Sequence, residues 1–254
     1  MRKSFLLVLP ALLLVAPASS SAQIAIPGCE RPATVTVPFA LVSVNGQCAD
    51  LSSLITRVPG SDLWNLTTHL TLAGSVIDLH AVFNPDPYIT FGGTTTNPID
   101  AAVTYAFLFG TPVVPDFYSS ATSSLGFSVT TPMGTTTVAN SGVYPTYLSG
   151  YGTLGAAATN LGVDLGTTPC VASGTGVTTT CDQGMATNTF TPGFYDNLEA
   201  LVTYTQDRTA STVAFTGAVT LEQATVTPEP TTLVLVGIGL MVIGAAARGR
   251  RKLV

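Results

Sequence analysis

Apolar and polar residues alternate with a period of two along most of the chain between residues 23 and 227. One such run covers residues 35–41, another covers 103–109, and the longest covers 212–221. A period of two is typical of strands that bury one face. Gly and Pro interrupt these runs at short intervals, as in the segment 84–87 (Asn-Pro-Asp-Pro), which predicts turns between strands.

This pattern predicts an all-β protein. Thr and Val favour strands, and strong helix formers such as Lys and Glu are scarce. Many short strands separated by turns predict a single β-sandwich or jelly-roll-like domain. The segment from Gly152 to Leu165 is the one place where a short helix fits the pattern. The absence of an internal repeat argues against a propeller or a solenoid.

One hairpin can be placed residue by residue around a two-residue turn at Ala73-Gly74. Its apolar face pairs Leu72 with Ser75, Leu70 with Ile77, Leu66 with Ala81, and Trp64 with Phe83. Its other face is polar, with His69 opposite Asp78 and Thr67 opposite His80. The register is consistent on both faces, which is the requirement for a strand with one buried side.

His69, Asp78 and His80 form the only cluster of histidine and carboxylate in the sequence. Two imidazoles and a carboxylate could bind a metal ion or transfer protons. A metal site would want a fourth ligand, and none is evident nearby. We therefore interpret the cluster as a solvated polar face with a cross-strand His–Asp pair, and we assign no catalytic residue, no metal site and no cofactor.

The glycine pattern G-x-G-x-x-G at residues 150–155 also matches a dinucleotide-binding fingerprint. That chemistry needs a strand before the glycines and a helix after them, in a βαβ unit. The surrounding Thr- and Gly-rich sequence does not supply this context, so we assign these glycines to turns.

The N-terminus has the layout of a secretory signal peptide. Arg2 and Lys3 precede an apolar stretch at residues 5–15, which is too short to span a bilayer. Small residues follow it, and we predict cleavage after Ala22. Residues 1–22 are therefore predicted to be an export signal, and residues 23–227 to be the extracytoplasmic domain.

The C-terminus combines a short motif, an apolar run and a basic tail. The tripeptide Pro228-Glu229-Pro230 precedes an apolar run at residues 231–247. This run is about the minimum length for a spanning helix. The tail at residues 248–254 carries the basic cluster Arg248, Arg250, Arg251 and Lys252. Basic residues collect on the cytoplasmic side of a membrane, so the domain is predicted to face outward.

These three features in this order resemble the PEP-CTERM sorting signal of exported bacterial proteins, which exosortases read. The resemblance covers residues 228–254. It implies recognition at Pro228, Glu229 and Pro230, cleavage close to them, and a link to extracellular polysaccharide or biofilm matrix. Thr231 is a mild departure, because the family often has Ala or Ser there. A GPI-type signal fits worse, since it ends in an apolar tail.

The predicted domain is strongly acidic once the two ends are removed. Residues 23–227 contain three basic residues, all arginine, and thirteen carboxylates, which gives a net charge of −10. The whole-chain value of −5 hides this, because the targeting ends are basic. An acidic surface repels phosphate backbones, which excludes nucleic acid as a partner.

Four cysteines remain after export: Cys29, Cys48, Cys170 and Cys181. An even number in an oxidising compartment predicts two disulfides. Three pairings are possible, and the sequence does not choose among them. Pairing of sequence neighbours, Cys29 with Cys48 and Cys170 with Cys181, is the simplest.

These observations favour an exported, exosortase-sorted protein of the cell envelope or extracellular matrix, non-catalytic and associated with exopolysaccharide. Its precursor is predicted to be anchored in the inner membrane by the C-terminal helix before cleavage. One alternative is a secreted polysaccharide-active hydrolase, which needs paired carboxylates in a groove. Another is a carbohydrate-binding or ice-binding module, which needs a row of exposed aromatic residues or a flat threonine lattice, respectively. The threonine clusters are consecutive, so neighbouring side chains point to opposite faces.

Overall fold

The computed structural model describes residues 24–208 and 210–224, and the regular secondary structure of this part of the chain is almost entirely antiparallel strand. The strands are β1 (Phe39–Val44), β2 (Gln47–Asp50), β3 (Thr56–Arg57), β4 (Trp64–Leu72), β5 (Ser75–Asn84), β6 (Tyr88–Thr96), β7 (Val103–Thr131), β8 (Gly134–Ala139), β9 (Leu148–Leu154), β10 (Ala157–Asn160), β11 (Cys170–Gly174), β12 (Val177–Gln206) and β13 (Thr212–Gln223). Within these residues the only helical element is the 3-10 turn η1 (Ser52–Leu54). The predicted all-β class is confirmed.

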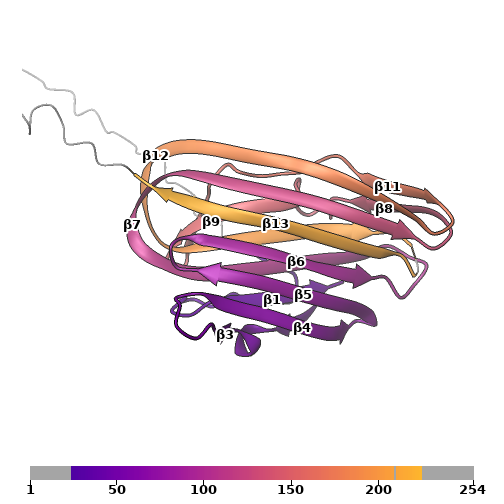
Figure 1. The fold of residues 1–254 in the computed structure, drawn as a ribbon, viewed down its shortest axis with the longest axis horizontal. Coiled ribbons are helices and arrows are strands. Elements are labelled where there is room, and N and C mark those ends of the chain that lie inside the picture. Colours follow the sequence, from indigo (N-terminus) through magenta and orange to yellow (C-terminus); the bar gives the residue numbers. More distant parts are fainter. Residues whose placement is uncertain (1–23, 209, 225–254) are drawn as a thin grey trace, which may run out of the picture.

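Two long strands, β7 and β12, bend and pass from one layer of a sandwich into the other (Figure 1). They pair with each other from Val177–Thr131 to Gln206–Val103, with register shifts near the bends. In the first layer the order is β4-β5-β6-β13, followed by the second half of β7 and the first half of β12. In the second layer, β1 flanks the first half of β7, and β9 and β10 follow the second half of β12.

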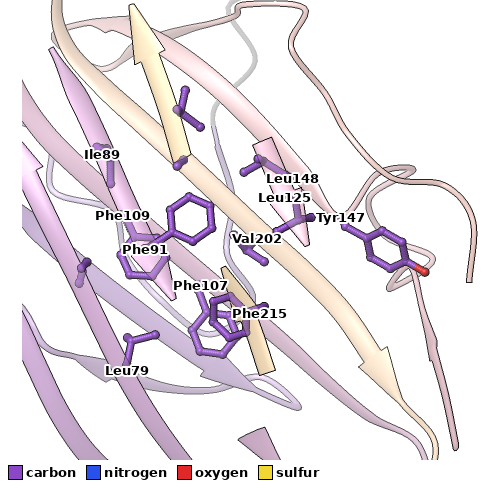
Figure 2. Close-up of a cluster of buried hydrophobic side chains, with 14 of the residues drawn as sticks. Leu79, Ile89, Phe91, Phe107, Phe109, Leu125, Tyr147, Leu148, Val202 and Phe215 are labelled. Atoms are coloured by element: carbon purple, nitrogen blue, oxygen red, sulfur yellow. The ribbon is translucent and has the colours of Figure 1, made fainter. Parts of the chain in front are cut away.

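The core lies between the two layers and is rich in aromatic residues (Figure 2). Phe109 of β7 stacks on Phe91 of β6, with ring centroids 5.2 Å apart. Phe107, two residues earlier on the same face, packs against Phe215 of β13 at 4.9 Å. Burying each of these rings contributes about 1.5–3 kcal/mol. The predicted alternations at residues 103–109 and 212–221 therefore supply the facing halves of one core.

The hairpin of β4 and β5 has the predicted register at every pair. Trp64 lies opposite Phe83, His69 lies opposite Asp78, and Leu72 lies opposite Ser75. Ala73 and Gly74 form the turn with φ angles of 51° and 81°. Positive φ at both turn residues is the geometry whose twist matches the flanking strands.

The expected short helix between Gly152 and Leu165 is wrong. This segment contains the end of β9 and all of β10, which pair antiparallel around a turn at Gly155. Gly152 lies within β9, where the ring of Tyr195 covers it. A Cβ at this position would come within 2.8 Å of that ring, so the position requires glycine. Two of the glycines assigned to turns, Gly150 and Gly152, are thus strand residues that permit close packing.

The two disulfides join sequence neighbours, so the simplest pairing is the one in the structure. Cys29–Cys48 ties the N-terminal segment to β2, and Cys170–Cys181 ties β11 to β12. They close loops of 19 and 11 residues. Each contributes about 3 kcal/mol in the chain-entropy account.

The predicted signal peptide at residues 1–22 and the sorting segment at 228–254 lie outside the described residues. Within residues 24–208 and 210–224, no helix is long and apolar enough to cross a membrane.

The turn at Ala73-Gly74 provides a test of the backbone geometry. We expect Ala73→Gly to raise the free energy of unfolding by about 0.5 kcal/mol, because relief of left-handed strain exceeds the entropy that glycine adds to the unfolded chain. Gly74→Ala should lower it by about 1 kcal/mol, since alanine is strained at positive φ. Urea unfolding of the oxidised protein measures both changes. Shifts of the same sign would contradict the assigned turn.

Candidate functional site

The two outer faces of the sandwich differ in what covers them. The second layer is covered by the N-terminal segment, where Ile24 and Ile26 pack with Phe39, Leu41 and Leu108 into a separate apolar cluster. The first layer carries no such cover within the described residues. Its outward side chains on β4, β5, β6, β13, residues 120–130 of β7 and residues 178–189 of β12 form the hydroxyl face.

Threonine and serine dominate the hydroxyl face because they alternate with buried apolar residues along the second half of β7 and along β13. Cross-strand pairing aligns them into rows. One row crosses six strands through Thr71, Val76, Thr96, Thr212, Thr130 and Thr178. Neighbouring strands lie about 4.8 Å apart, so this row is about 24 Å long. The result is a broad surface of hydroxyl groups that both donate and accept hydrogen bonds.

Some of these hydroxyl groups bond to one another. The Oγ1 atoms of Thr130 and Thr178 are 2.8 Å apart, and those of Thr96 and Thr212 are 3.3 Å apart. Nearer the bends, Ser120 donates to Glu222 at 2.7 Å. These contacts fix the orientation of the side chains on the hydroxyl face.

The centre of the hydroxyl face is hollowed around Gly126. Two shallow depressions of about 450 and 420 Å³ meet there and share Gly126, Asp182 and Thr216. Gly126 has no side chain, and a Cβ built on it would have no atom within 4 Å. The Asp182 carboxylate accepts a hydrogen bond from the Gly184 amide at 2.8 Å, where β12 bulges. The hollow therefore offers one oriented carboxylate among hydroxyl groups.

The predicted cluster of His69, Asp78 and His80 lies on the same face. His69 Nδ1 is 2.6 Å from Asp78 Oδ1, and Thr94 donates to Asp78 Oδ2 at 3.1 Å. The pKa of Asp78 is lowered, mainly by the hydrogen bond from His69. His80 lies elsewhere, with its ring over Gly92 of the next strand. The structure thus joins two of the three residues into an exposed pair.

No group of three or more His, Cys, Asp or Glu side chains within the described ranges could hold a metal ion.

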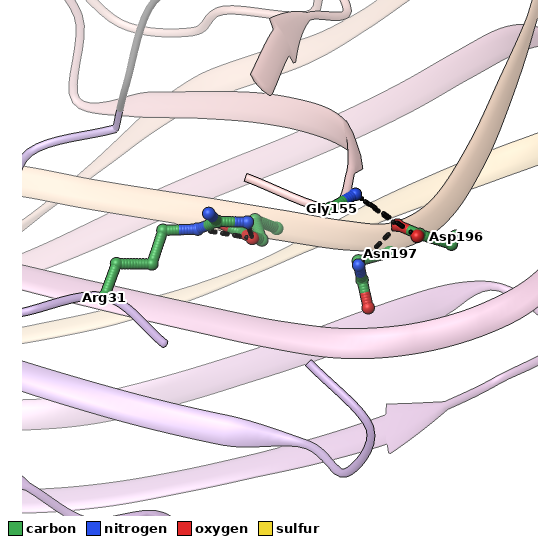
Figure 3. A network of polar contacts seen from close by, with 5 residues as sticks. Arg31, Gly155, Asp196 and Asn197 are labelled. Carbon is green, nitrogen blue, oxygen red and sulfur yellow. Dashed lines mark hydrogen bonds and ion pairs between the residues drawn. The ribbon is translucent and has the colours of Figure 1, made fainter. Parts of the chain in front are cut away.

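A second polar cluster, which the sequence analysis missed, is buried in the covered layer (Figure 3). Arg31 Nε lies 2.8 and 2.9 Å from the two carboxylate oxygens of Glu199, and a terminal guanidinium nitrogen adds a further contact. Only 5% of the Arg31 side chain and none of Glu199 is exposed. Burial raises the pKa of Glu199, while the Arg31 guanidinium opposes this rise.

The surroundings of this ion pair show a structural role. Asp196 accepts hydrogen bonds from the Gly155 amide at 3.2 Å and from Asn197 Nδ2 at 2.5 Å. Arg31 lies two residues after Cys29, so the ion pair and the disulfide hold the same segment on the second layer. The pair is enclosed by the segment that it fixes, and we do not assign it a ligand.

The sequence contained a signal for the hydroxyl face that could not be used alone. Thr, Ser and Gly alternate with apolar residues at 120–130 and 212–220. Which strands lie side by side decides whether such residues form rows, and only the fold supplies that order. The predicted sorting residues Pro228, Glu229 and Pro230 and the basic cluster at 248–252 lie outside the described residues.

The buried ion pair predicts a pH-dependent stability defect. Arg31→Met leaves the Glu199 carboxylate buried without a partner, and should cost about 3–5 kcal/mol of unfolding free energy at neutral pH. Burial raises the pKa of Glu199 in the folded state, so the folded protein takes up a proton there more readily than the unfolded chain does. The unfolding free energy of Arg31→Met should therefore increase as pH falls. Denaturant unfolding at pH 7 and pH 5 measures this. The double variant Arg31→Met/Glu199→Met is the control and should recover most of the loss.

The exposed pair predicts a change in titration. Replacing His69 by Ala should return the pKa of Asp78 toward its ordinary value, because the hydrogen bond from His69 is the main cause of its depression. Carbon-detected NMR of the side-chain carboxyl follows this directly. Thr71→Ala, on the same strand but without a contact to Asp78, is the matched control. An unchanged Asp78 titration in His69→Ala would contradict the assignment.

Comparison with protein families matches residues 226–252 to the PEP-CTERM protein-sorting motif, which confirms the predicted resemblance. No curated protein matches the chain. Among solved structures, "Structure of TmCBM61 in complex with beta-1,4-galactotriose" is similar over 72% of this chain and 88% of that chain, at 8% identity and a TM-score of 0.25. A TM-score this low does not establish a shared fold. The chain therefore carries, beside its β-sandwich, the sorting motif of exported proteins that an exosortase processes.

Proposed function

We propose that the chain is the precursor of a non-catalytic envelope or matrix protein whose hydroxyl face binds extracellular polysaccharide after an exosortase has removed the C-terminal segment. The observation that carries this proposal is the position of the sorting motif. The last strand, β13, ends at Gln223, and the motif begins at residue 226. Only two residues therefore separate the last strand of the domain from the segment that the sorting enzyme recognises. The hydroxyl face of the domain is uncovered within the described residues.

The chemistry of the face favours a neutral polysaccharide. Hydroxyl groups of Thr and Ser match the hydroxyl groups of sugars as hydrogen-bond donors and acceptors. The carboxylates of Asp78 and Asp182 lie in the rows, whereas Arg31 and Arg57 pair elsewhere with Glu199 and Asp62. A net charge of −10 over residues 23–227 repels polyanions.

The two alternatives fit this face less well. A hydrolase needs two carboxylates about 5–9.5 Å apart, whereas Asp78 and Asp182 are separated by four strand spacings, about 19 Å. An ice-binding lattice needs repeated rows of threonine. Only the first row approaches this, because Ala214, Gly126 and His80 interrupt the following ones.

The sorting step predicts a defined change in mass. Protein recovered from its host should end near residue 230, and replacing Pro228, Glu229 and Pro230 by Ala should abolish this cleavage. Intact-mass spectrometry of both forms measures it. The proposal fails if both forms retain the chain through Val254.

The hollow predicts where polysaccharide binds. Gly126→Leu should fill the hollow without backbone strain, since Gly126 is not at positive φ and its Cβ position is open. We expect it to weaken binding of the host exopolysaccharide, or of neutral dextran, by about tenfold, equivalent to about 1.4 kcal/mol. Affinity electrophoresis measures this, with anionic alginate for comparison.

The matched control is Ser173→Leu, which adds the same side chain to an exposed position of β11, away from the hollow. It should bind like the unaltered protein. Equal binding by Gly126→Leu and Ser173→Leu would remove the hollow from the site, and preference for alginate would contradict a neutral ligand.

A further inference from the structure

One end of the sandwich carries an exposed apolar tip, formed by Val114, Phe117 and Phe194. Their exposed fractions are 56%, 52% and 41%. Phe117 and Phe194 face each other across β7 and β12 at the bends, with ring centroids 5.4 Å apart in an edge-to-face arrangement. Two exposed phenylalanines side by side form an apolar patch on a surface where Thr, Ser and Gly are common, and such a patch marks a contact site.

The described chain ends at this tip. Strand β13 runs toward the bends of β7 and β12, and its last residue, Gln223, pairs with Tyr118 (Figure 1). The Ala224 amide then donates to the Phe117 carbonyl at 2.8 Å. The last described residue is therefore hydrogen-bonded to Phe117, which carries one of the exposed rings.

The connection to the predicted membrane span is short. Only residues 225–230 separate Ala224 from the apolar run that begins at Thr231. The seven residue-to-residue steps from Ala224 to Thr231 reach at most about 25 Å, even fully extended. The tip must therefore stay near the membrane surface while the precursor is anchored. Aromatic side chains favour the interfacial region of a bilayer, where an apolar ring can leave water.

We propose that the apolar tip contacts the interfacial region of the lipid bilayer that holds the precursor. This inference rests on the proposed function and on the anchoring of the precursor that the apolar run at residues 231–247 predicts. The edge-to-face rings do not form the coplanar platform on which a sugar ring would stack. The bilayer is thus the occupant that explains both the apolar character of the tip and its place at the chain exit.

Charge around the tip selects the kind of lipid. Asp116 adjoins Phe117, and the pKa of Tyr118 is raised by burial and by the nearby charges of Asp116 and Asp86. Glu222 lies on the last strand beside Ser120. These carboxylates repel an anionic surface, so the contact should be strongest on zwitterionic lipid.

The contact would also orient the domain. The tip lies at one end of the long axis of the sandwich, and β8 and β11 lie at the other end (Figure 1). With the tip on the bilayer, the long axis points away from the membrane. The hydroxyl face is then roughly perpendicular to the membrane plane and remains open to the extracytoplasmic space.

The test uses the full precursor, including its C-terminal segment, in phosphatidylcholine vesicles with brominated acyl chains that quench nearby tryptophan. Phe117→Trp and Phe194→Trp are the reporters. Val171→Trp is the matched control, because Val171 is 44% exposed on β11 at the far end. The native Trp64 is common to all three proteins. Flotation of the vesicles first establishes whether the precursor is anchored.

The expected result is flotation of all three proteins, with loss of tryptophan emission in the two tip variants and not in Val171→Trp. Adding phosphatidylglycerol at low salt should reduce this loss. Flotation without selective quenching would overturn the tip contact and leave the anchoring intact. Failure to float would overturn both. A third outcome is that the vesicles do not quench the tip tryptophans, and that these tryptophans become protected from solvent only when the sorting enzyme is added. This outcome would assign the tip to the enzyme and overturn the bilayer contact.

Discussion

The pairing of β7 with β12 along almost their entire length is the constraint on which the rest of the structure depends. Because both strands bend, one hydrogen-bonded ladder continues through both layers of the sandwich. Bulges near Tyr195 and between Thr189 and Gly193 absorb the change of direction without ending the ladder. The first halves and second halves of the two strands then nucleate different layers. Every other strand of the core is placed by pairing outward from this common ladder.

This ladder also explains why the two outer faces have different fates. In the second layer the outward residues of β7 and β1 are apolar, as at Leu108 and Leu41, and need a cover. The N-terminal segment provides it, held by Cys29–Cys48 and by the buried Arg31–Glu199 pair. In the first layer the outward residues are hydroxyl-bearing and tolerate water. The same two strands, β7 and β12, thus contribute to an apolar outer face, which the N-terminal segment covers, and to a hydroxyl-bearing outer face, which stays exposed to water.

The distribution of charge fits an exported protein. Arg31 and Arg57 are each paired with a carboxylate. The remaining carboxylates leave the surface acidic, which maintains solubility where the charged fraction is low. The apolar tip brings two exposed phenylalanine rings together, and it coincides with the point where the last described strand ends, close to the sorting motif.

Local sequence determined several features of this protein. The C-terminal sorting motif, the β class and the register of the β4–β5 hairpin follow from patterns within a few dozen residues, because turn geometry and a period of two act locally. Disulfide pairing stayed open among three possibilities. The segment 152–165 was misjudged, since the ring of Tyr195 over Gly152 comes from a distant strand.

The tertiary structure alone decided the site. Arg31 and Glu199 form an ion pair although 168 residues separate them in the sequence. The six strands that the row from Thr71 to Thr178 crosses come from four separate regions of the chain. No local pattern specifies which strands become neighbours. That order follows from burying all the apolar faces together in one core, which is a property of the whole chain.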